Sequence, residues 1–134
     1  LPKMIDALQS CREAEKEQAL FYRSLAFLAE EAADAALCER LHGLHADEQH
    51  HLSRISARLL ELGAAPVDLR HVRAQPASLQ EWEMRARERE REEIGRYQEL
   101  LGKALDHSTA DLIREILQTE QHHERELGGK WTPA

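Results

Sequence analysis

Aromatic residues, glycine and proline are all scarce in this chain of 134 residues. Phe, Trp and Tyr make up 4% of the sequence, and there are only 6 Gly and 4 Pro. Sheets are typically rich in aromatic and β-branched residues, whereas Ala, Leu, Glu, Arg and Gln, which dominate here, favour helices. The composition therefore predicts an all-α fold, and the length suits a single domain.

Cysteine, basic charge and long apolar runs are scarce as well. Cys11 and Cys38 lie far apart without a Cys-x-x-Cys spacing, which argues against a disulfide framework and a thiolate-only metal site. The net charge of -7 leaves no basic face for nucleic acid. No apolar run approaches the roughly 20 residues that span a bilayer, and no signal-peptide pattern is present. We expect a cytoplasmic protein that binds neither nucleic acid nor, in this segment, a membrane.

Apolar residues at helical spacing predict four helices in two antiparallel hairpins. A crossover with Pro66 and Pro76 separates the hairpins, and Ser78 with Glu81 forms a capping-box pattern that predicts the start of the third helix. The predicted helices cover residues 2–33, 35–62, 78–105 and 109–127, with the crossover at 63–78. Residues 1–129 would form one four-helix bundle with a single long connection, and residues 130–134, including Trp131, a loose tail.

Acidic residues interrupt the apolar stripe of every predicted helix. A carboxylate that faces a core costs several kcal/mol unless it is paired or bound to a cation. Two of these carboxylates are followed one turn later, on the same helix face, by an imidazole. The residues concerned are Glu15, Glu48 with His51, Glu90, and Glu120 with His123. Two cations bound between the helices would explain all four positions, and carboxylates with imidazoles suit iron or manganese.

The spacing of these residues repeats along the chain. Glu15-x6-Tyr22-x25-Glu48-x2-His51 in the first half is echoed by Glu90-x6-Tyr97-x22-Glu120-x2-His123 in the second half. A Glu-x-x-His tetrapeptide alone is weak evidence, but an internal repeat of the whole frame is specific. Glu90 also lies in a dense charged run, where a solvated helix surface is the alternative.

With these motifs the chain resembles the ferritin-like superfamily, and most of all the rubrerythrin and bacterioferritin diiron domains, over about residues 7–127. The resemblance implies two Fe ions, with Mn or Zn as substitutes. The implied ligands are Glu15, Glu48, His51, Glu90, Glu120 and His123, with Glu93 as a candidate additional ligand. We interpret Tyr22 and Tyr97 as core residues whose hydroxyls support the liganding carboxylates from behind.

The main prediction from this resemblance is a redox protein that binds Fe(II) and reduces O2 or peroxide at the dinuclear site. It would be rubrerythrin-like but without the rubredoxin domain, so that it needs a separate electron donor, and it would form a homodimer or a higher homo-oligomer. One alternative is a subunit of an iron-storage cage, although no sequence for a fifth helix follows Leu127. The other is a metal-free helical scaffold or interaction module whose polar core residues pair among themselves.

Overall fold

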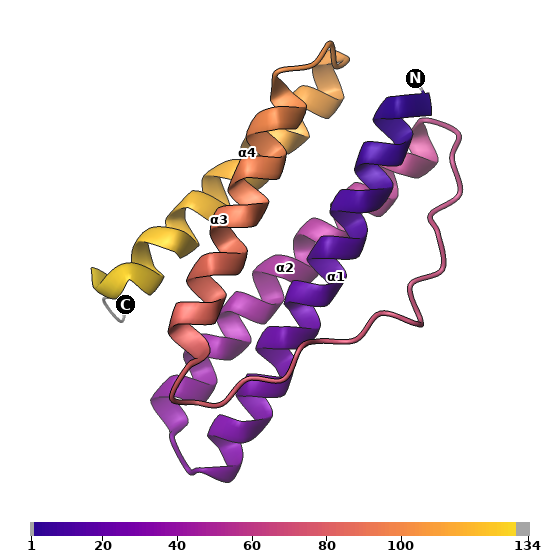
Figure 1. Ribbon diagram of the computed structural model, residues 1–134. Helices are drawn as coiled ribbons and strands as arrows, with labels where there is room; N and C mark the ends of the chain where they lie inside the picture. Colours follow the sequence, from indigo (N-terminus) through magenta and orange to yellow (C-terminus); the bar gives the residue numbers. More distant parts are fainter. Residues whose placement is uncertain (1, 131–134) are drawn as a thin grey trace. The chain divides into compact units, whose positions relative to one another are not determined.

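The computed structural model describes residues 2–130, which contain four α-helices and no strand (Figure 1). The helices are α1 (Pro2–Glu31), α2 (Ala35–Glu61), α3 (Trp82–Leu101) and α4 (His107–Arg125), and α4 runs into a π-helical turn, η1 (Glu126–Lys130). The predicted all-α fold is confirmed. None of the described helices is long and apolar enough to cross a membrane.

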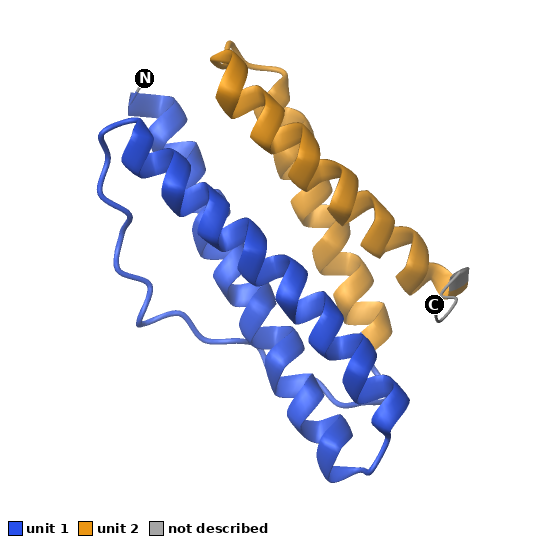
Figure 2. Cartoon of the chain, turned by 180° about the vertical axis from the view of Figure 1, so that it is seen from behind, with its two compact units in different colours: residues 1–82 blue, residues 83–134 orange. Residues whose placement is uncertain are grey.

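The chain divides into two compact units, Leu1–Trp82 and Glu83–Ala134 (Figure 2). Unit 1 holds α1, α2 and the crossover, and unit 2 holds most of α3 together with α4 and η1. The predicted single domain over residues 1–129 stays a prediction. The predicted tail covers residues 130–134, of which Lys130 belongs to η1, while residues 131–134, including Trp131, lie outside the described residues.

The turn between α1 and α2 is short and well defined. Ala33 adopts a positive φ of 58°, and the Asp34 N–H donates to Ala29 O at 3.0 Å. Asp34 then caps α2, because its Oδ1 accepts from Leu37 N at 3.1 Å. α1 therefore ends at Glu31, two residues before the predicted end, and the predicted break at Asp34 is confirmed.

Two polar side chains of α1 form hydrogen bonds with the backbone of the crossover. Gln9 donates from Nε2 to Ala65 O at 2.9 Å and accepts at Oε1 from Val67 N at 3.0 Å. Arg12 donates from Nη1 to Val67 O at 2.6 Å and from Nε to Ser56 Oγ at 2.7 Å. Partial burial lowers the pKa of the Arg12 guanidinium. These contacts give the extended segment backbone partners that a helix would otherwise supply.

α3 begins at Trp82, four residues later than predicted from Ser78. The Glu81 N–H donates to both the carbonyl and the hydroxyl oxygen of Ser78, at 3.2 and 3.3 Å. The capping contact is therefore formed, but it closes a tight i,i+3 turn before the helix starts. Trp82 is buried at 3% exposure, and the guanidinium carbon of Arg40 lies 5.1 Å from its ring centroid, which fixes the start of α3 in unit 1.

The connection between α3 and α4 differs from the prediction at both ends. α3 ends at Leu101, four residues early, because Gly102 N donates to the carbonyls of Gln98 and Glu99 and closes the last turn. α4 begins at His107, two residues early, because Asp106 is the N-cap. The Asp106 carboxylate accepts from Thr109 N at 3.2 Å and from Thr109 Oγ1 at 2.6 Å.

α4 ends at Arg125, two residues before the predicted end at Leu127. The helical conformation does not end before Gly128 but continues as the π-helical turn η1, in which Gly129 has a φ of 92°. Only a residue without a Cβ adopts this backbone conformation at little cost, so a glycine suits this position.

Candidate metal centre

All six residues that the sequence predicted as metal ligands are buried. The stripes that carry them are continuous on their helices: Leu41, Leu44, Glu48, His51, Ile55 and Leu59 on α2, and Ile116, Glu120, His123 and Leu127 along α4 and η1. Glu15, Glu48, Glu90 and Glu120 are each 0% exposed. Fully buried carboxylates at four positions require compensation by cations, protons or hydrogen bonds.

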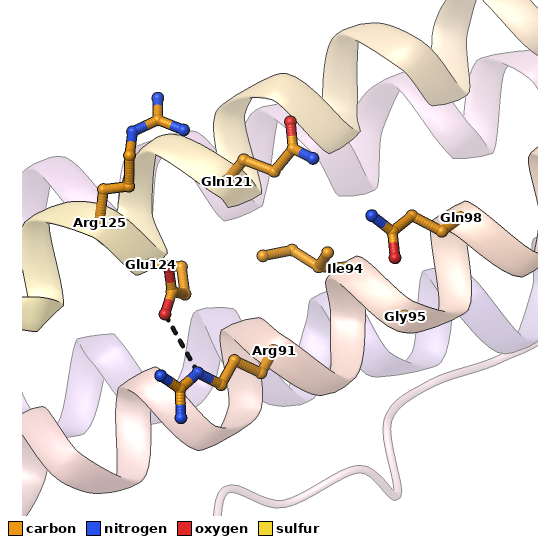
Figure 3. A pocket seen from close by; sticks show the side chains of 7 residues that line it. All are labelled: Arg91, Ile94, Gly95, Gln98, Gln121, Glu124 and Arg125. Carbon is orange, nitrogen blue, oxygen red and sulfur yellow. Dashed lines mark hydrogen bonds and ion pairs between the residues drawn. The ribbon is translucent and has the colours of Figure 1, made fainter.

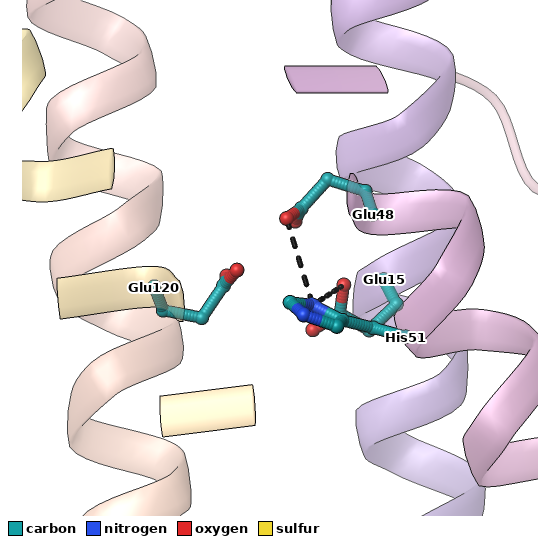
Figure 4. Close-up of side chains that lie close together, drawn as sticks. All are labelled: Glu15, Glu48, His51 and Glu120. Atoms are coloured by element: carbon teal, nitrogen blue, oxygen red, sulfur yellow. Dashed lines mark ion pairs between the residues drawn. The ribbon is translucent and has the colours of Figure 1, made fainter. Parts of the chain in front are cut away.

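In unit 1, Glu15 on α1 and Glu48 on α2 both reach the imidazole of His51. His51 Nδ1 lies 3.5 Å from Glu15 Oε2 and 3.7 Å from Glu48 Oε1. Figure 4 shows both carboxylates turned toward this ring. Ligand atoms of the three residues lie within 4.8 Å of one another, and we call this group triad 1.

In unit 2, Glu90 on α3 and the pair on α4 repeat this arrangement. His123 Nδ1 lies 3.1 Å from Glu90 Oε2 and 3.5 Å from Glu120 Oε1. We call this group triad 2. Each hairpin thus brings a Glu from its first helix to a Glu-x-x-His pair on its second helix, as the internal repeat predicts. Glu90 is buried, so its alternative interpretation as a solvated residue of the charged run is wrong.

The donor atoms of each triad fit a transition-metal ion. Ligands held at about 2.0–2.2 Å from a metal, at the angles of a tetrahedral or octahedral site, lie roughly 3–3.5 Å from one another. The distances from His51 Nδ1 and His123 Nδ1 to the carboxylate oxygens span 3.1–3.7 Å. Two carboxylates and one imidazole form a donor set that suits iron or manganese and admits zinc. A cation would also offset the cost of burying two carboxylates in each hairpin.

The other predicted site residues are buried in the same hairpins. Tyr22 and Tyr97 are each 0% exposed, one on α1 and one on α3, seven residues after the first Glu of their triad. Glu93 is 5% exposed, one turn after Glu90, and its Oε1 accepts from Arg96 Nη1 at 2.6 Å. The roles of these three residues as supporting hydroxyls and as an additional ligand stay predictions.

Two features beside the triads carried no assigned role in the sequence. Gln18 is buried at 1% exposure on α1, one turn after Glu15, and its place in the apolar stripe was the available signal. Glu124, next to His123, accepts at Oε1 from Arg87 Nε at 2.9 Å and Arg91 Nε at 3.1 Å (Figure 3 shows the Arg91 contact). The hydrogen bond from Arg87, opposed by partial burial and supported by Arg91, lowers the pKa of the Glu124 carboxyl.

These two hydrogen bonds join α3 to α4 directly beside a triad residue. Arg87 and Arg91 are one turn apart on α3, and this i,i+4 spacing within the charged run was the available sequence signal. The contact therefore helps to hold the backbone that carries His123.

Comparison with known proteins gives one family match and several structural matches. A family model described as the ferritin-like domain matches residues 5–130. None of the curated proteins matches the chain at a significant level.

Several solved structures share the fold. The bacterioferritin of Desulfovibrio desulfuricans, described with a diiron site in different catalytic states, superposes with a TM-score of 0.87 and 21% identity, over 96% of this chain and 77% of that one. The dodecameric thioferritin of Bacteroides fragilis, a bacterioferritin-related protein, gives 0.84 and 26%, over 96% and 83%. The bacterioferritin of Rhodobacter capsulatus gives 0.87 and 19%, over 96% and 83%.

Proposed function

The chain belongs to the ferritin-like domain family and has the fold of a ferritin-like four-helix bundle, and on this basis we propose that it oxidises Fe(II) at a dinuclear centre as a subunit of an iron-storage assembly. The observation that carries the proposal is the pair of equivalent buried triads, one in each hairpin. We propose that triad 1 and triad 2 together bind two iron ions, with one imidazole for each ion.

The proposed reaction balances with two substrate ions. Two Fe(II) ions release one electron each, and these two electrons with two protons reduce O2 to hydrogen peroxide and leave two Fe(III) ions. Bound iron supplies the redox chemistry, whereas the protein supplies geometry and a low dielectric. Glu48 and His51, one helical turn apart, present their donors from one face of α2, as Glu120 and His123 do from α4.

Buried apolar residues flank both Glu-x-x-His pairs. Ile55 follows His51 by one turn and Ile116 precedes Glu120 by one turn, and both are fully buried. These side chains keep water away from the carboxylates, so that the charges of the ligands and of the substrate ions attract each other in a medium of low dielectric.

The relatives favour storage over the rubrerythrin-like function that the sequence first suggested. The three solved structures compared above are two bacterioferritins and a bacterioferritin-related protein, and the bacterioferritin-related protein is dodecameric. We propose a comparable homo-oligomer for this chain. In the storage function Fe(III) itself is the product that leaves the centre, so a separate electron donor is not required. Peroxide reduction with such a donor remains the second candidate function.

The proposal is tested by adding Fe(II) to the metal-free protein under nitrogen, admitting O2, and recording O2 uptake and Fe(III) absorbance. Glu48→Gln and Glu120→Gln should each slow oxidation about tenfold or more, because each removes a negatively charged ligand. Glu115→Gln, an exposed residue on the same helix as Glu120, is the matched control and should oxidise Fe(II) at the unaltered rate. Equal rates in all four proteins would exclude the assigned centre and leave a metal-free scaffold.

Size-exclusion chromatography separates the two redox functions. A storage assembly like the dodecameric relative should elute near twelve times the chain mass of 15.4 kDa and should retain Fe(III) in the protein fraction. A dimer that retains no Fe(III) but consumes peroxide when supplied with a reductant would favour the rubrerythrin-like alternative.

A further inference from the structure

The internal repeat contains one further buried polar position in each hairpin. Counted from the first Glu of each triad, the two frames read Glu15-x2-Gln18-x3-Tyr22 and Glu90-x2-Glu93-x3-Tyr97. Gln18 is 1% exposed on α1, and Glu93 is 5% exposed on α3. The same position relative to a triad is therefore polar and buried in both hairpins, but it holds a neutral amide in unit 1 and a carboxylate in unit 2.

Packing alone does not account for a polar side chain at this position. The buried residues that flank the two frames along the same stripes are apolar, namely Cys11 and Leu25 on α1 and Ala86 and Leu100 on α3. Burying an amide or a carboxylate costs free energy that a leucine would not cost. Residues three apart on a helix bring their Cβ atoms to about 5–6 Å from each other, so this side chain lies beside the first Glu of its triad.

The residue three positions further along differs between the two hairpins as well. Glu93 Oε1 accepts from Arg96 Nη1 at 2.6 Å, whereas the corresponding residue of α1 is Phe21, which is buried. The side chain of Arg96 is 41% exposed and that of Glu93 is 7% exposed. Water therefore screens the positive charge of Arg96 more than the negative charge of Glu93. Unit 2 thus keeps an excess of negative charge beside triad 2, at the position where unit 1 has the neutral Gln18.

We propose that Gln18 and Glu93 make the two metal positions unequal, so that triad 2 binds the first cation tightly and triad 1 binds the second cation more weakly. This inference rests on the dinuclear centre proposed above. The two triads have the same donor set, two carboxylates and one imidazole, so the residue beside each triad decides the difference. The Glu93 carboxylate attracts a dication through a medium of low dielectric, and the Gln18 amide carries no net charge. In an iron-storage function, the ion at triad 1 is the first to leave its position.

A calorimetric titration of the metal-free full chain with Co²⁺ tests the inequality. The wild-type chain should bind two Co²⁺ ions in two steps of unequal affinity. Glu93→Gln removes the charge beside triad 2 and should weaken the first step about tenfold or more, toward the affinity of the second. Gln18→Glu adds a charge beside triad 1 and should strengthen the second step about tenfold or more, toward the affinity of the first.

Each variant has a control that changes the charge in the same way at an exposed residue of the same unit. Glu92→Gln is the control for Glu93→Gln, and Gln49→Glu, next to Glu48 on α2, is the control for Gln18→Glu. Both controls should keep both affinities, because water screens charges at the surface. Arg96→Gln removes the opposing positive charge and should strengthen the first step, whereas a purely structural role of the Glu93–Arg96 pair would not.

The inference and the proposed function fail in different ways. Two equal steps in the wild-type chain, or a first step that Glu93→Gln leaves unchanged, would overturn the inference and leave the dinuclear centre standing. A wild-type chain that binds no Co²⁺ would overturn both. Gln18→Glu buries an added charge, so circular dichroism must establish that its helices are intact. If this variant does not fold, Glu93→Gln decides the matter alone, because it buries one charge fewer than the wild-type chain.

Discussion

Nδ1 of His123 lies 3.1 Å from Oε2 of Glu90. This hydrogen-bond contact joins α3 to α4, and both side chains are buried. A cation on this imidazole would take the place of the shared proton. The contact therefore ties the stability of unit 2 to whatever occupies triad 2.

Metal removal should lower the melting temperature of the protein. A ligand present at about a thousand times its dissociation constant stabilises the folded state by roughly 4 kcal/mol, and chelation removes this contribution. The measurement is calorimetric melting before and after treatment with a chelator. Glu120→Gln is the comparison, because a variant that binds metal poorly should melt at nearly the same temperature in both conditions. An identical wild-type melt with and without chelator would contradict the assignment of the triads.

In the metal-free protein, Glu48→Gln should stabilise the fold. Glu48 is fully buried close to His51, so its charge pays a desolvation cost that a neutral amide of similar shape largely avoids. We expect a gain of about 1–3 kcal/mol in the free energy of unfolding, measured by urea denaturation. The exposed Glu115→Gln should change it by less than about 0.5 kcal/mol. A metal-free Glu48→Gln protein that is less stable than wild type would mean that the carboxylate is compensated without metal.

The cap of α4 should contribute measurably to stability. Asp106 accepts hydrogen bonds from both the backbone N–H and the hydroxyl of Thr109. Asp106→Ala should cost about 1 kcal/mol in urea denaturation, whereas Asp106→Asn should cost less because an amide oxygen still accepts. Equal losses in the two variants would show that the charge near the helix N-terminus, rather than the hydrogen bonds, is what matters.

The pKa of Asp68 in the crossover should depend on Arg70. The side-chain hydrogen bonds from Arg70, and then its backbone N–H at 2.9 Å, lower this pKa below the ordinary value of 3.8. The ionised Asp68 carboxylate therefore stabilises the folded state above pH 3.8. This contribution is lost as the pH falls through the lower pKa that Asp68 has in the folded protein. Arg70→Gln should raise the pKa in an NMR titration of the carboxyl carbon, but only part of the way, because the backbone N–H remains. Arg73→Gln should leave it unchanged.

The helices and the triads were predictable because they follow from periodicity. A polar residue in an apolar stripe, such as Glu48 between Leu44 and Ile55, can be recognised from the sequence alone. The repeat of the Glu-Tyr-Glu-His frame then identifies its counterpart Glu120. Burial of all six predicted ligands agrees with this logic.

What the sequence did not predict depends on contacts between distant residues or on competing local turns. Ser78 makes its capping contact, but the i,i+3 turn that it closes delays α3 until the buried Trp82. The hydrogen bonds of Gln9 and Arg12 to the crossover span 55 or more residues, and no local pattern indicates them. The shared use of Glu124 by two arginines was hidden within a charged run that is typical of a solvated helix surface.

The primary amide of Gln9 matches two backbone groups of opposite polarity, an acceptor at Ala65 and a donor at Val67. Moving the crossover by one residue in one direction would bring Pro66, which has no backbone N–H, to Oε1 of Gln9 in place of Val67. The number of residues between Ala65 and Val67 therefore cannot change without the loss of one of the two hydrogen bonds to Gln9. Insertions and deletions should be tolerated on either side of this three-residue clasp but not within it.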